Sequence, residues 1–241
     1  MADTRLSILK VGSTFPALRT RRGDFEDWIA AGAGLAATQV RVIDVSAGEP
    51  LPVDPAAAGI IVTGSHAMVT ERNDWSERAA EWLRNAADRG VPVLGICYGH
   101  QLLAHAFGGE VGDNPRGSEF GTAQIVLETA AQRDELLGGL PATFAAHEGH
   151  TQAVLSLPPG AVRLASDDWD PHQAFRIRSR AWGVQFHPEF DPDIMHAYIR
   201  WDRQMLAAEG QDPDALSKTV RDSPRSAEVL RRFAALCRRA S

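Results

Sequence analysis

The chain has 241 residues, of which 44% are hydrophobic and 23% are charged. This composition is typical of a globular protein, and the length fits one large domain with or without an appended segment. The formal net charge of −6 argues against a nucleic-acid partner, because phosphate binding needs a basic surface. Two cysteines are too few for a disulfide framework, and no apolar run reaches the ~18 residues that span a bilayer. We therefore expect a cytoplasmic protein that binds no membrane.

The first 110 residues alternate between short apolar runs and helical stretches. The runs are rich in Val, Ile and Leu and lie at 6–11, 40–45, 59–64 and 91–96. They do not alternate cleanly between apolar and polar residues, which is typical of strands buried on both faces of a parallel sheet. Between the last two runs, Asp74 and Glu77 resemble a capping box, and Gly90 suits a helix end. This strand–helix–strand order predicts an α/β protein with a doubly wound, mostly parallel central sheet.

The second half of the chain has a different pattern. Segments between residues 120 and 186 are more β-like, and turn residues separate them. Three helical stretches then follow from residue 191, the last of them at 226–239. We expect one domain at residues 1–190 and a C-terminal helical extension at 191–241 that packs on the same domain.

The two cysteines have different surroundings. Cys97 directly follows a buried run, and a helix is predicted to begin at Tyr98, with Gly95 and Gly99 on either side. This is the G-x-nucleophile-x-G form of a nucleophile elbow, in which small residues permit a sharp turn. A thiol at a helix N-terminus lies at the positive end of the dipole, which favours the thiolate. Cys97 is therefore a candidate nucleophile, whereas Cys237 lies on the apolar stripe of the last helix and is expected to pack there.

A candidate base lies far downstream. His187 follows the strand-like residues 183–186, and Glu189 comes two residues later. In an extended backbone, residues two apart point the same way, and Pro188 favours that conformation for His187. One face therefore presents an imidazole with a carboxylate beside it, which is the arrangement a cysteine nucleophile needs.

Together these motifs resemble a known family. The segment G-I-C-Y-G-H-Q at 95–101, followed by G-V-Q-F-H-P-E at 183–189, is similar to the class I (triad) glutamine amidotransferases. The N-terminal segment and the helical tail look like stand-alone relatives of the GMP synthase amidotransferase domain. The resemblance implies a flavodoxin-like fold, with residues 1–190 as a type 1 glutamine amidotransferase domain. It also implies a triad of Cys97, His187 and Glu189.

Further site residues follow from the same resemblance. The backbone N–H groups of Gly64 and Tyr98 would form the oxyanion hole. The substrate would be bound by Gln101, Glu119, Phe120 and His150. Of these, Glu119 is the expected partner of the substrate's α-ammonium group.

The resemblance implies hydrolysis of the glutamine side-chain amide through a γ-glutamyl thioester, which releases glutamate and ammonia. The chain contains neither an S-G-G-x-D-S pyrophosphate loop nor a G-x-x-x-x-G-K-[ST] loop, so a separate synthetase or ammonia acceptor is the expected partner. One alternative is a γ-glutamyl peptidase or hydrolase with the same triad. Another is a non-catalytic regulatory module, against which the intact triad argues. The sequence does not decide whether the chain forms a homodimer.

Two further patterns suggest cofactors or metals but fit them poorly. The G-x-G-x-x-A match at 32–37 follows a helical stretch, whereas a dinucleotide site requires a preceding strand. His147 and His150 are three residues apart, with Gly149 between them and no clear third ligand. We therefore expect no cofactor and no metal.

Overall fold

A computed structural model describes residues 5–55 and 57–240 of the chain. Its strands are β1 (Leu6–Lys10), β2 (Val40–Asp44), β3 (Gly59–Val62), β4 (Val93–Ile96), β5 (Glu110–Asp113), β6 (Glu119–Leu127), β7 (Thr143–His150), β8 (Gln152–Ser156), β9 (Val162–Ser166), β10 (Ala174–Ile177) and β11 (Ala181–Val184). Its α-helices are α1 (Pro16–Arg22), α2 (Phe25–Ala33), α3 (Asp74–Asp88), α4 (Tyr98–Ala106), α5 (Pro192–Trp201), α6 (Arg203–Ala208), α7 (Pro213–Thr219) and α8 (Pro224–Ala240). Short 3-10 helices are η1 (Ala37–Gln39), η2 (Val69–Glu71) and η3 (Thr129–Arg133).

The central sheet is mixed. In the described residues it has nine strands in the order β2-β1-β3-β4-β11-β10-β9-β6-β7, and β5 and β8 form a separate pair. The pairings from β2 through β11 are parallel, whereas those from β11 through β7 are antiparallel. The four apolar runs of the first half form β1 to β4, so the prediction of an α/β fold with a parallel core is confirmed. Three of the β-like segments of the second half form β6, β9 and β10 of the antiparallel extension. The other two form β11, which pairs parallel with β4, and β8, which pairs with β5.

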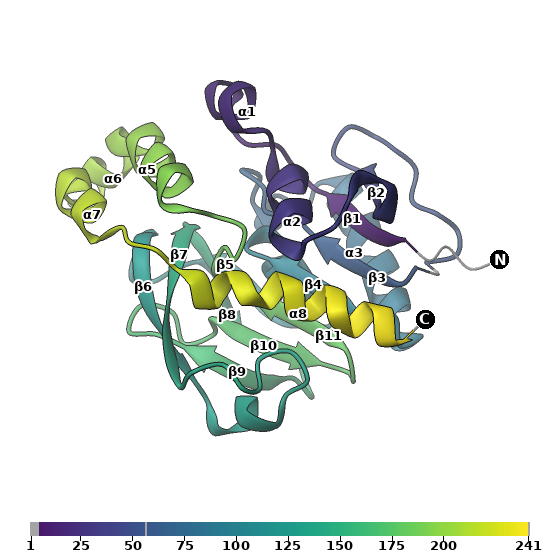
Figure 1. The fold of residues 1–241 in the computed structure, drawn as a ribbon. Helices are drawn as coiled ribbons and strands as arrows, with labels where there is room; N and C mark the ends of the chain where they lie inside the picture. The colour runs from purple at the N-terminus through teal and green to yellow at the C-terminus, as the bar shows by residue number, and fades with distance from the viewer. Residues whose placement is uncertain (1–4, 56, 241) are drawn as a thin grey trace.

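Strands β1, β3 and β4 are buried on both faces, as their sequence pattern predicted, whereas the edge strand β2 is partly exposed. Ile8 belongs to the hydrophobic cluster on one face of the sheet and its neighbour Leu9 to the cluster on the other face. Helices α2 and α8 supply side chains to the first cluster, and α3 and α4 supply them to the second. Figure 1 shows this arrangement of layers, with α8 running across one face of the sheet. Successive strand residues point to opposite faces, which explains why these runs do not alternate in polarity.

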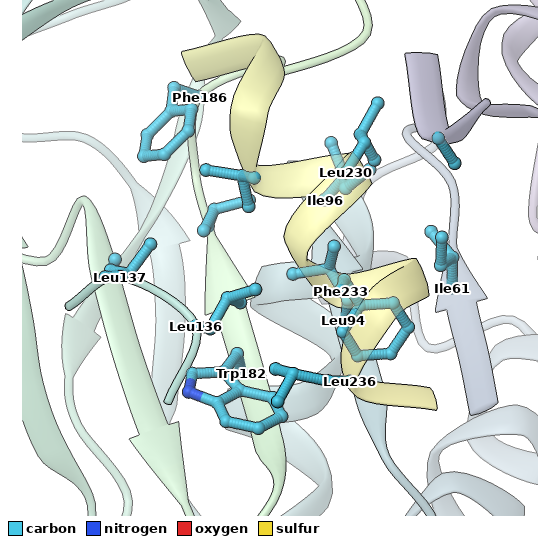
Figure 2. Packing of buried hydrophobic residues seen from close by; sticks show 14 of the residues in the cluster. Ile61, Leu94, Ile96, Leu136, Leu137, Trp182, Phe186, Leu230, Phe233 and Leu236 are labelled. Carbon is cyan, nitrogen blue, oxygen red and sulfur yellow. The ribbon is translucent and has the colours of Figure 1, made fainter. Parts of the chain in front are cut away.

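The C-terminal part folds as four helices, where the sequence pattern indicated three. The extra helix arises because the chain turns at Asp202, which ends α5 and begins α6. Helices α5, α6 and α7 group beside the β6–β7 end of the sheet (Figure 1). Helix α8 instead contributes to the main core, where Phe233 meets Trp182 edge-to-face at 6.3 Å between ring centroids (Figure 2). Cys237 is buried in the same cluster.

Helix α3 begins where predicted, but its predicted capping box does not form. Its N-cap residue is Asn73, whose side chain makes no capping hydrogen bond. The carboxylate of Glu77 contacts His105 and Arg72 instead of turning back to the helix start. The N-terminal end of α3 is therefore fixed by tertiary contacts more than by a local capping box.

The glycine-rich segment at 32–37 closes helix α2. Gly34 has a φ of 68°, the left-handed conformation that commonly ends a helix, and its N–H bonds back to Ala30 and Ala31. The segment therefore has the position expected of a helix end. None of the helices in the described part of the chain combines the length and apolar character needed to cross a bilayer.

The burial of α8 predicts a large loss of stability when its core residue is truncated. Phe233→Ala removes a fully buried ring and is expected to lower the free energy of unfolding by about 3–5 kcal/mol. Arg231→Ala, at an exposed position of the same helix, is expected to change it by about 0.5 kcal/mol or less. Urea unfolding followed by circular dichroism measures both. A similar, small effect of the two substitutions would contradict the assignment of α8 to the core.

Candidate active site

Cys97 occupies a sharp turn between β4 and α4. Its backbone has φ 51° and ψ −103°, which is uncommon for a residue with a side chain. A Cβ atom on Gly95 would overlap the carbonyl oxygen of Gly99, and a Cβ on Gly99 would lie 2.7 Å from the carbonyl oxygen of Val62. Both glycines are therefore required for the helix to start so close to the strand. The N–H of Gln101 bonds to the carbonyl of Cys97 at 3.1 Å and closes the first helical turn.

His187 and Glu189 form a buried pair beside Cys97. The Nδ1 atom of His187 lies 2.7 Å from Oε1 of Glu189. The side chain of Cys97 is close enough to the imidazole to raise the pKa of His187. The ring of Phe190 stacks on the imidazole at 4.0 Å between centroids. The backbone N–H of His187 donates to the carbonyl of His147 at 2.9 Å. His187 is thus held by stacking on its ring face, by the contact of Nδ1 with Glu189 and by a hydrogen bond of its backbone N–H.

Opposing effects act on the protonation of His187. Burial works to lower the pKa of its imidazole, but the charges of Glu189 and Cys97 work to raise it. The charges prevail, so the pKa of His187 is well above its ordinary value. A protonated imidazole between a carboxylate and a sulfur atom is suited to hold a thiolate and to deliver a proton to a leaving group.

Gly64 and Tyr98 lie on two sides of this centre. Tyr98 is the first residue of α4, so its N–H belongs to the set that has no acceptor within the helix. A Cβ on Gly64 would lie 3.2 Å from Cε1 of His187, so the loop after β3 passes directly against the imidazole. The phenol of Tyr98 points elsewhere: it bonds Ser76 at 2.7 Å, and burial raises its pKa to about 12. The hydroxyl of Tyr98 is therefore already engaged with α3.

Cys97 opens into a cavity of about 220 Å³. Of the residues predicted to bind substrate, Gln101, Phe120 and His150 line it, whereas Glu119 does not. The other lining residues lie outside the predicted set of substrate contacts, namely Ser65, His66, Ala67, Met68, Gly149, Thr151, Gln152, Tyr198, Trp201, Asp202 and Met205. The last four come from α5, α6 and the turn between them. Their sequence spacing indicates a helix but gives no sign that this helix borders the cavity.

Gln101 and His150 are held in place by hydrogen bonds from behind the cavity. The Nε2 atom of Gln101 donates to the carbonyl of Gln152 at 2.6 Å and to the side chain of Gln185 at 3.0 Å. His150 contacts the same Gln152 carbonyl through Nδ1 at 3.0 Å. Burial lowers the pKa of His150, so its imidazole is neutral at physiological pH. These residues form a fixed, uncharged wall.

Glu119 lies behind that wall. Its carboxylate accepts a hydrogen bond from Gln173 at 3.2 Å and lies 3.1 Å from Nε2 of His150. Burial, reinforced by the neighbouring Asp167, raises the pKa of Glu119 well above its ordinary value. The β6–β7 register pairs Glu119 with His150 and leaves its carboxylate among buried groups, so it does not reach the cavity. Its position does not support the α-ammonium contact that we expected.

One buried cluster has the composition of a metal site. Ligand atoms of Glu119, Glu148 and His150 lie within 4.8 Å of one another, whereas His147 bonds Thr122 at 3.1 Å and is not part of it. Glu148 is fully buried, and burial together with the charge of Glu119 raises its pKa well above the ordinary value. A metal ion would have to displace the protons of these carboxyl groups, and the raised pKa values make that displacement harder.

Comparisons with known proteins agree with this geometry. The family model for glutamine amidotransferase class-I matches residues 25–202. A GMP synthase of Aeropyrum pernix is 42% identical over 136 residues, 56% of this chain and 25% of that protein. A glutamine-hydrolysing GMP synthase subunit of Pyrococcus abyssi is 35% identical over 55% of this chain and 66% of that protein. Gamma-glutamyl peptidase 4 of Arabidopsis thaliana is 29% identical over 73% and 69%, respectively.

The fold is likewise shared with solved structures. A glutamine amidotransferase of Thermotoga maritima superposes with a TM-score of 0.74 at 19% identity, covering 98% of this chain and 97% of that one. With a family match over most of its length, the chain belongs to the class I glutamine amidotransferases. It is related to the amidotransferase part of GMP synthases and spans about a quarter of the length of the Aeropyrum enzyme.

The buried pair predicts a specific response of the His187 imidazole. In a Cys97→Ala background, Glu189→Gln removes the remaining charge that raises the pKa, so burial is expected to lower it. The ring then loses its proton at lower pH than in Cys97→Ala alone, as an NMR titration of the imidazole would measure. Glu77→Gln removes a carboxylate from the surface residue His105 and serves as the control. An unchanged His187 titration after Glu189→Gln would contradict the pairing.

Proposed function

We propose that this chain hydrolyses the side-chain amide of glutamine through a covalent γ-glutamyl thioester on Cys97. The observation that carries the proposal is the position of Cys97 on a strained elbow beside an imidazole whose positive charge Glu189 stabilises. Family membership supports the same reaction class. In this proposal Cys97 is the nucleophile, His187 is the acid and base, and Glu189 orients the imidazole.

The reaction proceeds in two displacements. The sulfur of Cys97 attacks the amide carbon, and the backbone N–H groups of Gly64 and Tyr98 stabilise the oxyanion. His187 donates its proton to the leaving nitrogen, the C–N bond breaks, and ammonia departs from the thioester. The neutral imidazole then takes a proton from water as the water oxygen attacks the thioester carbon. The C–S bond breaks, glutamate is released, and the thiolate and imidazolium are restored.

We also propose that a partner protein receives the ammonia. The relatives include complete GMP synthases and a separate GMP synthase subunit, so a synthetase on another chain is the partner that these similarities favour. The triad chemistry itself needs only the chain's own side chains, backbone amides and water.

A second candidate function is hydrolysis of γ-glutamyl peptides by the same triad. The similarity to the Arabidopsis γ-glutamyl peptidase favours it, because it extends over 69% of that protein. The two functions differ in the group that leaves, which is ammonia in one case and an amino acid or peptide in the other. Comparing kcat/KM for glutamine and for γ-glutamyl dipeptides separates them.

The nucleophile assignment is tested by covalent labelling. An electrophilic glutamine analogue is expected to modify Cys97, as peptide mass spectrometry would locate, and Cys97→Ala is expected to lower glutamine hydrolysis by roughly a thousandfold or more. Cys237→Ala is the matched control, because Cys237 is buried in the core and should remain unlabelled. Labelling of neither cysteine would refute the proposed site.

A further inference from the structure

The outer wall of the cavity has no role in the chemistry described above. Tyr198 and Trp201 come from α5, Met205 comes from α6, and Asp202 lies at the turn between the two helices. The indole of Trp201 is 55% exposed although it borders the cavity. Release of ammonia requires no such surface, because the leaving group of glutamine is a single nitrogen atom.

Asp202 is unusual among the acidic residues of this region. Of the described residues that line the cavity, it is the only one with a carboxylate, and none is a lysine or arginine. The nearby Asp191 pairs with Arg22, and Asp214 pairs with Arg203. No hydrogen bond or ion pair is made by the Asp202 side chain within the described residues, and burial alone raises its pKa to about 6. It is therefore mostly ionised at neutral pH, half-buried and available to a cation.

The position of this wall relative to His187 indicates which part of a substrate it meets. Tyr198 packs on Phe190 at 5.0 Å between ring centroids, and Phe190 stacks on the imidazole of His187 at 4.0 Å. A general acid must reach the nitrogen that leaves, so the leaving group lies on the imidazole side of the scissile carbon. Helix α5 packs against the imidazole through Tyr198 and Phe190, which favours the leaving-group side of the cavity for Asp202 at the end of the same helix.

We propose that Asp202 forms a subsite for a cationic leaving group, so that the preferred substrates are γ-glutamyl amides whose amine part carries a second ammonium group. A γ-glutamyl diamine is the simplest member of this class. Its methylene chain would lie on the apolar surfaces of Trp201, Met205 and Met68. A leaving amino acid would instead bring a carboxylate toward Asp202, and like charges repel most strongly where water is partly excluded. This inference rests on the proposed function and names its substrate class.

The step balances in the same way as glutamine hydrolysis. The C–S bond to Cys97 forms, the amide C–N bond breaks, and the proton of His187 goes to the leaving nitrogen. The diamine departs, and water then converts the thioester to glutamate and regenerates the thiolate. Asp202 contacts the distant ammonium group and takes no part in proton transfer.

Three isosteric substrates test the proposal on the wild-type chain. They are the γ-glutamyl amides of 1,4-diaminobutane, pentylamine and 4-aminobutyrate, whose far ends are cationic, neutral and anionic at the same distance from the amide. A charge-assisted contact predicts that kcat/KM is roughly tenfold or more higher for the cationic than for the neutral amide, and lowest for the anionic one. Raising the salt concentration is expected to reduce this ratio, because part of Asp202 is exposed to solvent.

A pair of variants locates the effect. Asp202→Asn is expected to bring the ratio of the cationic to the neutral amide close to one. Asp214→Asn removes the same charge from the exposed side of α7, outside the cavity, and is expected to keep the wild-type ratio. The ratio separates a leaving-group contact from a structural defect or an α-ammonium contact, since either of those would lower all three rates together.

The outcomes distinguish this inference from the function on which it rests. Equal rates for the three amides, with glutamine hydrolysed and Cys97 labelled, would overturn the subsite and leave the proposed function intact. An equal decrease of all three rates in Asp202→Asn would likewise overturn it. If neither glutamine nor any of the amides forms a thioester at Cys97, the proposed function itself fails, and the subsite with it.

Discussion

The close contact between strand β4 and helix α4 is the constraint on which the site depends. It exists because Gly95 and Gly99 have no side chains, and it forces Cys97 into a positive φ. Strand β4 lies between β3 and β11 in the parallel half of the sheet. The loops that follow these three strands therefore meet at one edge and bring Gly64, Cys97 and His187 together. Three segments far apart in the chain thus become one site through the order of the strands.

Burial and charge then separate the histidines around this site. Burial lowers the pKa of His147 to about 4 and that of His100 to about 3, and it also lowers those of His66 and His150. Only at His187, among these five, do neighbouring negative charges outweigh burial and raise the pKa. The environment therefore leaves one charged imidazole among neutral ones, next to the thiol. Such a separation of pKa values is how a protein assigns distinct acid and base roles to chemically identical groups.

The N-terminal segment supports helix α5, which supplies part of the outer wall of the cavity. Phe15, before α1, stacks on Trp201 at 4.4 Å, and Thr14 bonds the hydroxyl of Tyr198 at 3.0 Å. Arg22 pairs with Asp191 at the start of α5. These contacts hold the outer wall against the N-terminal segment, independently of the elbow. The outer wall of the cavity is therefore supported by different contacts from those that hold the elbow at the strand ends.

The sequence by itself determined the parallel strands, the elbow and the His-x-Glu pair, because each is encoded by neighbouring residues and by local backbone sterics. It did not determine where Glu119 points, since that depends on the pairing of β6 with β7, strands joined through a long connection. Nor did it reveal Asp202, which reaches the cavity only because α5 and α6 pack beside residues about a hundred positions earlier. Long-range packing decides that the carboxylate of Glu119 is buried behind the cavity and that Asp202 lines it.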